Sequence, residues 1–470
     1  MGKSHVFDAR SQMPVSASEL FSWHAREGAF ERLAPPWERV EVLERTGDGI
    51  RQGARAVVRM KLGPISQRWV AEHTAYEEGS LFQDQQLSGP FSKWVHTHRM
   101  LQESASTSVL EDSIEYVLPV GPLGNAFGNG FARNKLARMF AYRHRVTRED
   151  LRRHAAFAGH GPLTVAITGA SGLVGTSLTP FLTTGGHRVK RLVRGKADAS
   201  RGEISWAPDK GQVDTDALEG TDAVVHLAGA NVGQRWSPEY KDLILKSRTE
   251  GTRTLSEALA RLKRKPRVLV CAVGTGFYGD RGDEPLTETS APGTGFLADV
   301  CRAWEASTAP AEAAGIRVVH LRIGPVLDAR DGALAKMLPA FKAGGGGPIS
   351  SGRQWFSWVS LEDLLGLIHF SLFTEAARGP INAVAPGAVR QVDFARTLGR
   401  VLRRPAFFPV PAPVIRTLFG EMGQETVLSG AHVLPSAAER LGFPFLLPDL
   451  EEALRFTLGR TTAGPEYRLS

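Results

Sequence analysis

The sequence predicts an α/β fold, in which a doubly wound parallel sheet is preceded by an α+β domain and followed by a C-terminal extension. Three observations predict this arrangement. Short apolar runs alternate with helical segments in the middle of the chain, which is the pattern of a parallel sheet. A glycine-rich turn joins the first of these runs to the first of these helices. Earlier in the chain, apolar residues alternate with polar ones, and one long helical segment follows.

Length and charge limit the classes of protein to be considered. A chain of 470 residues is long enough for two or three domains, and we place these at residues 1–155, 163–402 and 403–470. The formal net charge is +8, but most basic residues are interspersed with acidic ones. The local excess at residues 133–153 accompanies no nucleic-acid-binding motif. We therefore expect a small-molecule substrate and no nucleic-acid partner.

No targeting or anchoring signal is evident. The longest apolar runs, such as residues 224–230 and 268–273, are far too short to span a bilayer. The opening residues contain no apolar core of a secretory signal. Cys271 and Cys301 offer no disulfide framework. We expect a cytoplasmic protein without a membrane span.

The N-terminal domain is predicted to consist mostly of β-strands. After an opening strand, Ser16 and Glu19 have the spacing of a capping box and predict a helix that continues through Trp23. Alternation of apolar and polar residues then predicts strands at residues 56–62 and 110–118.

One long helix, over residues 123–147, is predicted to close this domain, and residues 148–161 are predicted to be a linker. The helix can form an apolar stripe from Phe127, Phe131, Leu136, Met139 and Phe140. Because the sheet and the helix each need to cover an apolar face, we expect the helix to lie on the sheet.

Two local motifs, Gly89-Pro-Phe91 and Trp94-Val-His-Thr-His98, resemble those of START-like helix-grip domains, the cyclase/dehydrase and aromatase relatives. This resemblance implies an α+β helix-grip fold with an apolar ligand between sheet and helix. His96 and His98 share one strand face with Trp94, as a metal-binding pair would. Because no third ligand is evident, we interpret them as pocket or core residues and predict no metal site.

The second domain opens with a strand at residues 163–168, a turn that contains Gly169, Gly172 and Gly175, and a helix at residues 176–183. This order is the fingerprint of a Rossmann-type dinucleotide-binding domain. The first glycine permits the tight turn, the second lets the pyrophosphate approach, and the third lets helix and strand pack closely. We expect the phosphates to meet free backbone amides at the helix N-terminus, near Ser171, Leu173 and Val174.

The next strand predicts which nicotinamide cofactor binds. It ends at Val193, where NAD-binding proteins usually place an acid that holds the ribose hydroxyls. Here Arg194 follows, with Lys196 nearby, and a guanidinium can pair with a 2′-phosphate. We therefore predict NADP(H) rather than NAD. A later buried strand ends in Ala228 and Gly229, whose small side chains let the backbone lie close to the cofactor.

In combination, the second and third domains resemble the extended short-chain dehydrogenase/reductases, the superfamily of nucleotide-sugar epimerases. They look closest to an atypical branch of putative NADP-dependent oxidoreductases that ends in a domain of unknown function. The resemblance spans residues 163–456 and is carried by ordered motifs: Gly229-Ala-Asn-Val, Arg235-Trp236, Ser247-Arg248, Gly276-Phe-Tyr-Gly-Asp-Arg-Gly282, Phe296-Leu-Ala-Asp-Val-Cys-Arg-Ala-Trp304-Glu305, Arg322-Ile-Gly-Pro-Val-Leu327, Gly352-Arg-Gln-Trp-Phe-Ser-Trp358 and Asn382-Ala-Val-Ala-Pro386.

The chain departs from this superfamily where the chemistry should lie. The superfamily uses a Ser or Thr and a Tyr-x-x-x-Lys, in which the lysine lowers the pKa of the tyrosine so that it acts as general acid or base. The corresponding helix, from residue 296, contains neither Tyr nor Lys. Thr275 and Tyr278 are the nearest hydroxyls and are our catalytic candidates. The branch also carries a histidine where this chain has Ser360, although Asp363 remains.

Two functions stay open at this stage. The first is an NADP(H)-dependent oxidoreductase or epimerase that acts on a small polar or anionic substrate, with Arg235, Arg322 and Gln354 as candidate substrate ligands. The second is a non-catalytic NADPH-binding sensor or scaffold, in which the N-terminal domain binds an apolar ligand. As a further option, this domain carries a hydrophobic substrate to the reductase domain.

Overall fold

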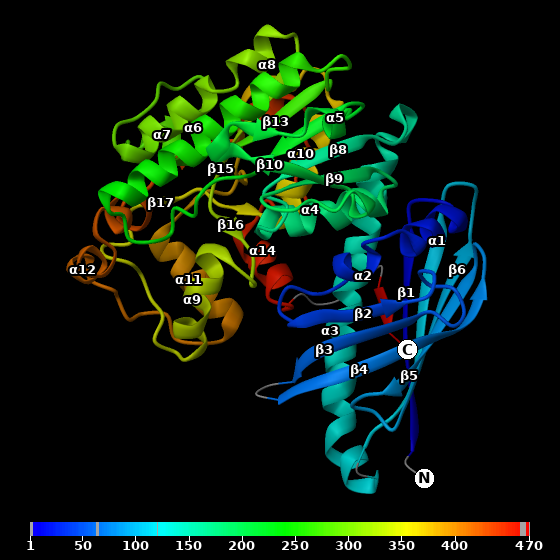
Figure 1. Cartoon of the computed structure of the whole chain (residues 1–470). Coiled ribbons are helices and arrows are strands. Elements are labelled where there is room, and N and C mark those ends of the chain that lie inside the picture. Colours follow the sequence, from blue (N-terminus) through cyan, green and yellow to red (C-terminus); the bar gives the residue numbers. More distant parts are fainter. Residues whose placement is uncertain (1–2, 63–64, 120, 461–466, 470) are drawn as a thin grey trace. The chain divides into compact units, whose positions relative to one another are not determined.

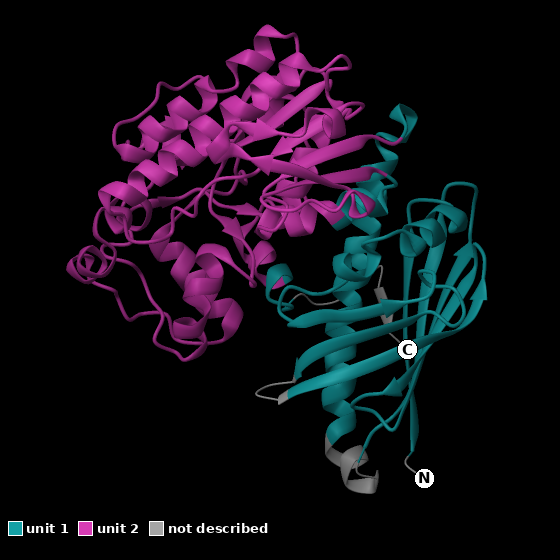
Figure 2. Cartoon of the chain, viewed as in Figure 1, with its two compact units in different colours: residues 1–161, 180–186, 456–470 teal, residues 162–179, 187–455 magenta. Residues whose placement is uncertain are grey.

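The structure is a computed structural model that describes residues 3–62, 65–119, 121–460 and 467–469. Figure 1 shows the elements in chain order. The chain divides into two units, one made of residues 1–161, 180–186 and 456–470, the other of residues 162–179 and 187–455 (Figure 2). Each unit is described on its own.

The first unit contains an antiparallel sheet of eight strands in the order β2-β3-β4-β5-β6-β7-β1-β22. These strands are β1 (Ser4–Met13), β2 (Val40–Thr46), β3 (Arg55–Leu62), β4 (Ile65–Glu77), β5 (Leu81–Ser88), β6 (Lys93–Gln102), β7 (Ser108–Val117) and β22 (Tyr467–Leu469). The strands predicted from alternation correspond to β3 and β7. The last strand was not predicted, because the C-terminal extension was expected to be helical.

Three helices accompany this sheet: α1 (Ala17–Ala25), α2 (Ala29–Arg32) and α3 (Gly121–Ala155). The predicted cap of α1 is present, since the Glu19 amide donates to Ser16 Oγ at 3.3 Å. The predicted linker at residues 148–161 is wrong over its first half, because α3 continues to Ala155. Its charged residues looked like a solvated linker, but Asp150 is buried and forms an ion pair with Arg32 at 2.7 Å.

The core of this unit lies between the sheet and α3, as the helix-grip prediction requires. Leu136 and Phe140 of α3 pack with Phe7, Trp94 and Ile114 of the sheet. The predicted stripe on the helix is wrong at one position, since the Phe131 side chain is 74% exposed. Phe127 was also assigned to the stripe, but its side chain lies outside the described residues.

The second unit is built on a sheet of eight strands in the order β11-β10-β9-β8-β12-β13-β15-β19, parallel except for the β10–β11 pair. The strands are β8 (Thr164–Thr168), β9 (Arg188–Val193), β10 (Glu203–Ala207), β11 (Gln212–Val213), β12 (Ala223–His226), β13 (Val268–Gly274), β15 (Arg317–Ile323) and β19 (Gly379–Ala383). From β8 the chain runs outward through β9 and β10, then returns to β12 on the other side of β8. This reversal between β8 and β12 is the switch point at which such sheets bind ligands.

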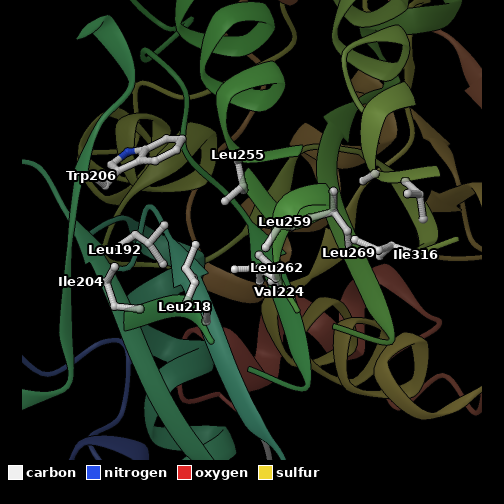
Figure 3. Packing of buried hydrophobic residues seen from close by; sticks show 13 residues of the cluster. Leu192, Ile204, Trp206, Leu218, Val224, Leu255, Leu259, Leu262, Leu269 and Ile316 are labelled. Carbon is white, nitrogen blue, oxygen red and sulfur yellow. The ribbon is translucent and has the colours of Figure 1, made fainter. Parts of the chain in front are cut away.

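Helices cover this sheet and bury its apolar residues. They are α4 (Leu173–Thr184), α5 (Thr215–Leu218), α6 (Pro238–Arg261), α7 (Phe296–Ala306), α8 (Ala309–Ala313) and α10 (Leu361–Phe373). Helix α9 (Gly332–Lys342) instead packs beside the short strand β16 (Val326–Leu327). Figure 3 shows Leu255 and Leu259 of α6 packed on Val224 and Leu269 of the central strands. The doubly wound fold predicted from the sequence is therefore confirmed.

The later part of the second unit consists of short elements. They are β14 (Pro285–Leu286), β16 (Val326–Leu327), β17 (Trp355–Phe356), β18 (Val359–Ser360), β20 (Val389–Arg390), α11 (Gln391–Leu402), α12 (Ala412–Gly423), β21 (His432–Val433), α13 (Ser436–Arg440) and α14 (Leu450–Thr457). β21 pairs in parallel with β14, which ties this segment back to the middle of the chain. Within the described ranges, none of the helices has the length and apolar character to cross a membrane.

Candidate functional site

The turn after β8 is shaped by two glycines that the protein itself requires. Gly169 has a φ of +66° and lies against the exit of β12, where a Cβ would meet the Leu227 carbonyl carbon at 2.8 Å and the Ala228 nitrogen at 2.9 Å. At Gly175, a Cβ would lie 2.4 Å from the Gly169 oxygen. Both positions are closed by backbone, which cannot move aside as a flexible side chain can. These contacts bring the N-terminus of α4 up to the strand.

Gly172 differs from both of them. The nearest atom to a Cβ at this position is the Gly169 oxygen at 3.4 Å, which is an ordinary van der Waals contact. Gly172 and the preceding Ser171 are exposed. Nothing within the described protein therefore demands a glycine here. The bare backbone instead leaves room outside the turn, which is where a pyrophosphate approaches in this fingerprint.

Three backbone amides of the same turn have no acceptor among the described residues. The Gly172 amide donates to the Gly169 oxygen at 3.0 Å, and the Thr176 amide donates to the Gly172 oxygen at 2.9 Å. In the part of the chain that the structure describes, the amides of Ser171, Leu173 and Val174 donate to no protein oxygen. Free amides at a helix N-terminus attract anions, because the helix dipole adds to their partial charge.

A buried series of hydrogen bonds through Thr168 and His226 fixes the backbone that follows β12. Thr168 Oγ1 accepts from the amides of Leu227 and Ala228, both at 3.1 Å. Its own hydrogen is therefore left for His226 Nδ1, at 2.7 Å. Since Nδ1 then accepts, His226 carries its hydrogen on Nε2 and donates it to Thr252 Oγ1 at 2.9 Å. Burial lowers the pKa of His226 to about 4, so the neutral ring persists at ordinary pH.

The loop that follows β12 carries little side chain. The amide of Ala230 donates to Ser247 Oγ of α6 at 3.0 Å. A Cβ at Gly229 would meet the Arg248 guanidinium carbon at 3.1 Å. Arg248 lies over the Trp304 ring, 4.8 Å from its centroid. Arg248 belongs to a motif of the family resemblance but was not predicted as a site residue.

The end of β9 carries exposed basic residues. Arg194 and Lys196 follow the strand and are exposed. Arg194 makes no ion pair or hydrogen bond with any other described residue. The nearby acids are engaged elsewhere, because Glu203 pairs with Arg191 at 3.0 Å and the Asp198 carboxylate accepts from its neighbour Ser200. The guanidinium of Arg194 is therefore available to an anionic ligand.

Tyr278, one of the two catalytic candidates, is completely buried. It lies at the end of a short 3-10 turn, Thr275–Tyr278, which follows β13. Its hydroxyl donates to Asn382 Oδ1 at 2.6 Å and accepts from Arg322 at 2.9 Å. Burial raises the pKa of Tyr278. Arg322 in turn forms a two-pronged ion pair with Glu305 at 2.8 and 3.0 Å.

The other catalytic candidate, Thr275, has a different environment. Its side chain is partly exposed at the carboxyl end of β13, and its hydroxyl has no hydrogen-bond partner within the described residues. The two candidates thus differ in what they can reach. A ligand can contact Thr275 directly, whereas Tyr278 is enclosed by Asn382 and Arg322.

Helix α7 is the helix in which the family resemblance led us to expect a Tyr-x-x-x-Lys. Its N-terminus is capped from the C-terminal segment, because Glu425 accepts from the amides of Phe296 and Leu297, both at 2.9 Å. This carboxylate neutralises the helix end that would otherwise attract an anion. Sequence reasoning missed Glu425, since it lies far from α7 in the chain and belongs to no motif.

The three predicted substrate ligands lie in separate networks. Exposed Arg235 donates to the Thr417 carbonyl at 3.3 Å. Gln354 donates to the carbonyls of Ile349 and Val427, at 3.2 and 3.1 Å, and so braces two loops. Arg322 is engaged with Glu305, as described above. The structure joins these side chains through no shared hydrogen bond among the described residues.

Ser360 lies at the N-terminus of α10. It caps α10, because its Oγ accepts from the Asp363 amide at 3.0 Å. The Asp363 carboxylate accepts from the amides of Leu446 and Leu447, at 2.7 and 3.0 Å. The predicted role of Asp363 at a helix N-terminus is present, and it also anchors the C-terminal segment.

Three family profiles match the chain in succession. The polyketide cyclase/dehydrase and lipid transport family matches residues 13–141. The NAD dependent epimerase/dehydratase family matches residues 165–383. A domain of unknown function, DUF1731, matches residues 410–457. The helix-grip resemblance of the N-terminal domain and the short-chain dehydrogenase resemblance of the following part are thereby confirmed.

Known proteins resemble the chain over long stretches. An epimerase family protein from Mycobacterium bovis is 40% identical over 297 residues, 63% of this chain and 98% of the relative. A solved nucleoside-diphosphate sugar epimerase from Corynebacterium glutamicum is 32% identical, with a TM-score of 0.78 over 97% of this chain and 91% of that one. Human epimerase family protein SDR39U1, solved with NADPH, is 31% identical, with a TM-score of 0.59 over 64% of this chain and 100% of that one. The glycine turn at the switch point and these identities lead to one conclusion: the chain belongs to the NAD dependent epimerase/dehydratase family.

Proposed function

We propose that the second unit is an NADP(H)-dependent oxidoreductase or epimerase that acts on a small polar or anionic substrate. The observation that carries this proposal is the turn at Gly172, where the protein needs no glycine and yet leaves backbone amides free. A side chain at this position would occupy the space in which a pyrophosphate meets those amides. Exposed Arg235 and partly exposed Thr275 support a polar or anionic substrate, because a guanidinium and a hydroxyl can both donate hydrogen bonds to its oxygens.

Two observations support NADP(H) over NAD. The strand that reads the adenosine ribose ends without an acid, and unpaired Arg194 follows it. A guanidinium can bind a 2′-phosphate through two parallel hydrogen bonds. In addition, the human relative SDR39U1 was solved with NADPH. Lys196 adds a second positive charge at the same strand end.

A bound nicotinamide would supply or accept a hydride. When the hydride goes to a carbonyl carbon of the substrate, the carbonyl oxygen takes up a proton. We propose that Thr275 positions this oxygen by donating a hydrogen bond to it. A threonine hydroxyl is too weak an acid to give up its proton alone, so the proton comes from solvent. Tyr278 is proposed to support the turn rather than to react, because Asn382 and Arg322 already use its hydroxyl.

The experiment begins with titration of the purified full chain with NADPH, NADP, NADH and NAD. We expect submillimolar affinity for the 2′-phosphorylated forms and weaker affinity for the others. Oxidation of NADPH is then followed with a panel of carbonyl compounds and nucleotide sugars. Tighter binding of NAD than of NADP would contradict the cofactor assignment.

The same panel tests a second function, a cofactor-binding sensor or scaffold without catalysis. The observation that favours it is the full use of the Tyr278 hydroxyl within the protein, together with an α7 that carries neither Tyr nor Lys. Under this function, NADPH binds but no compound of the panel oxidises it. The Thr275→Val variant separates the two functions further. If the protein is an enzyme, the variant should have lower turnover and unchanged NADPH affinity. If it is a sensor or scaffold, there is no turnover to lower.

For the N-terminal unit, we propose that the helix-grip domain binds an apolar ligand, which in an enzyme could also be the substrate. Its match to the polyketide cyclase/dehydrase and lipid transport family supports this proposal. Organic extraction of the purified full chain followed by mass spectrometry should reveal a lipid or isoprenoid in stoichiometric amount. Extracts that hold no such compound, from several expression conditions, would argue against it.

A further inference from the structure

Neighbouring strands of the N-terminal sheet place histidine and aspartate side chains on one face. Asp84 of β5 is paired with His96 of β6, and His98 of β6 is paired with Asp112 of β7. Alternate residues of a strand point to the same face, and so do paired residues of neighbouring strands. These four side chains therefore point the same way, and His144 of α3 reaches the same cluster.

Asp112 contacts one nitrogen of each of three imidazoles. Its Oδ1 lies 2.9 Å from His96 Nε2 and 2.6 Å from His98 Nδ1, and its Oδ2 lies 2.6 Å from His144 Nε2. The His98 contact is short but is not aligned as a hydrogen bond, so this buried nitrogen has no hydrogen-bond partner within the described residues. Ser11 Oγ lies 2.9 Å from the remaining nitrogen of His144 and fixes that ring.

The other nitrogens of His96 and His98 face Asp84. His96 Nδ1 lies 3.4 Å from Asp84 Oδ2, and His98 Nε2 lies 4.0 Å from the same oxygen. One ligand atom of each of the three residues lies within 4.8 Å of the ligand atoms of the other two. Ligand atoms about 2.0–2.2 Å from one zinc ion are separated by roughly 3.5 Å. Small side-chain rotations would therefore bring all three atoms to bonding distance of a single ion.

We propose that Asp84, His96 and His98 bind a divalent transition-metal ion such as Zn²⁺, and that Asp112 is the carboxylate that orients both imidazoles. In metal sites, a ligating histidine commonly donates its second ring N–H to a carboxylate, which fixes the ring and its tautomer. Here the Asp112 carboxylate is hydrogen-bonded to His96 and lies 2.6 Å from His98 Nδ1, where a small rotation of the ring would align a second hydrogen bond. The nitrogens that remain face a second carboxylate, Asp84. The third ligand that the sequence did not reveal is therefore Asp84.

Charge and burial support the same site. The side chains of His96 and Asp112 are only 5% and 3% exposed. Two carboxylates, Asp84 and Asp112, lie within this largely buried cluster. Buried negative charge requires a cation or donated hydrogen bonds. A divalent ion supplies that charge at the point where the ligand atoms converge.

The donor set also selects the kind of ion. Imidazole nitrogens suit Zn²⁺, Fe²⁺ and other transition metals, whereas Mg²⁺ and Ca²⁺ prefer oxygen donors. Two histidines and one carboxylate leave coordination positions open for water or for an oxygen of a ligand. A ligand in the interior of this helix-grip domain could then bind the metal ion through an oxygen atom, in addition to its contacts with apolar side chains.

The test uses the full chain after removal of any affinity tag and after stripping with a chelator. Zn²⁺ is titrated against a chromogenic chelator, and we expect one ion to bind per chain. His98→Gln and Asp84→Asn should each lower the affinity at least tenfold. Asp112→Asn, which removes the orienting carboxylate, should lower it by about 10- to 100-fold. His5→Gln is the matched control, since His5 lies in the same sheet but outside the cluster. The Zn²⁺ affinity of this variant should equal that of the wild type.

Two further readouts guard against variants that simply misfold. Co²⁺ should give the wild type a visible absorption band typical of nitrogen and oxygen ligation, and His98→Gln should lack it. Circular dichroism of the full chain, which includes the antiparallel sheet of the first unit, confirms that each variant keeps its folded structure. The proposal is overturned if the stripped wild type binds Zn²⁺ no more tightly than folded His98→Gln. In that case the cluster is a network of hydrogen-bonded imidazoles without a metal.

Discussion

Single glycines of the phosphate turn differ in what a methyl group would meet. At Gly169 and Gly175 the obstacle is backbone of the protein itself, whereas at Gly172 it is the proposed ligand. This difference separates stability from binding within one motif. It also explains why the sequence pattern predicted the turn correctly, since each glycine has its own steric cause.

The first prediction concerns Gly172→Ala. We expect the variant to fold with an unchanged melting temperature but to bind NADPH about 10- to 100-fold more weakly, because its Cβ occupies the path of the pyrophosphate. Calorimetric titration measures the affinity. Gly175→Ala is the contrasting variant, and overpacking against the Gly169 oxygen should cost it about 1–3 kcal/mol of stability. Equal melting temperatures for the two variants would contradict this assignment.

The second prediction concerns Arg194→Ala. Loss of a charge-assisted pair with the 2′-phosphate should weaken NADPH binding by roughly 1.5–3 kcal/mol and leave NADH binding unchanged. Arg191→Ala is the control, because Arg191 is engaged with Glu203. Dissociation constants for both cofactors are needed for both variants. An equal loss for NADPH and NADH would show that Arg194 does not read the 2′-phosphate.

The third prediction is a pH dependence that originates at His226. Its folded pKa of about 4 lies below the unfolded value of about 6.5, so the unfolded chain binds the proton first. Stability is therefore full above about pH 6.5 and falls as the pH drops toward 4, by roughly 2 kcal/mol near pH 5. His226→Gln should flatten this part of the curve. Urea unfolding at several pH values, for the wild type and the variant, measures the difference.

At the scale of elements, α7 depends on a distant cap. Glu425 accepts from two amides at its N-terminus. The fourth prediction is that Glu425→Ala lowers the free energy of unfolding by about 1–2 kcal/mol, as loss of a helix cap does. Denaturant unfolding measures it, and Glu439→Ala on α13 is an exposed control. No change in stability would mean that water replaces the carboxylate at no cost.

Local patterns predicted the elements that depend on local physics. The cap at Ser16, the alternation of β3 and β7, and the strand-turn-helix at Gly169 all follow from neighbours in the chain. The end of α3 was misjudged, because a buried ion pair with Arg32 turns a charged segment into helix. The partners of the imidazoles in β6 were missed for a similar reason, since strand register decides which carboxylate stands opposite.

At the scale of the whole molecule, the chain carries two proposed sites in different units. The fifth prediction uses this separation. NADPH at about 100 times its dissociation constant should stabilise the second unit by roughly 2.7 kcal/mol. His98→Gln should show the same stabilisation by NADPH while losing the stabilisation by Zn²⁺. Differential scanning calorimetry of the full chain, with each ligand alone, measures both effects.

The pairing of β22 with β1 has a consequence for biosynthesis. The sheet of the first unit takes its outer strand from residues 467–469, which the ribosome delivers only after the whole second unit. During translation, β1 is therefore an unpaired edge strand, and unpaired edge strands pair with other chains and promote aggregation. A fragment limited to residues 1–161 would keep that edge permanently. Its solubility should improve when a short peptide with the sequence of residues 467–469 is appended through a flexible linker.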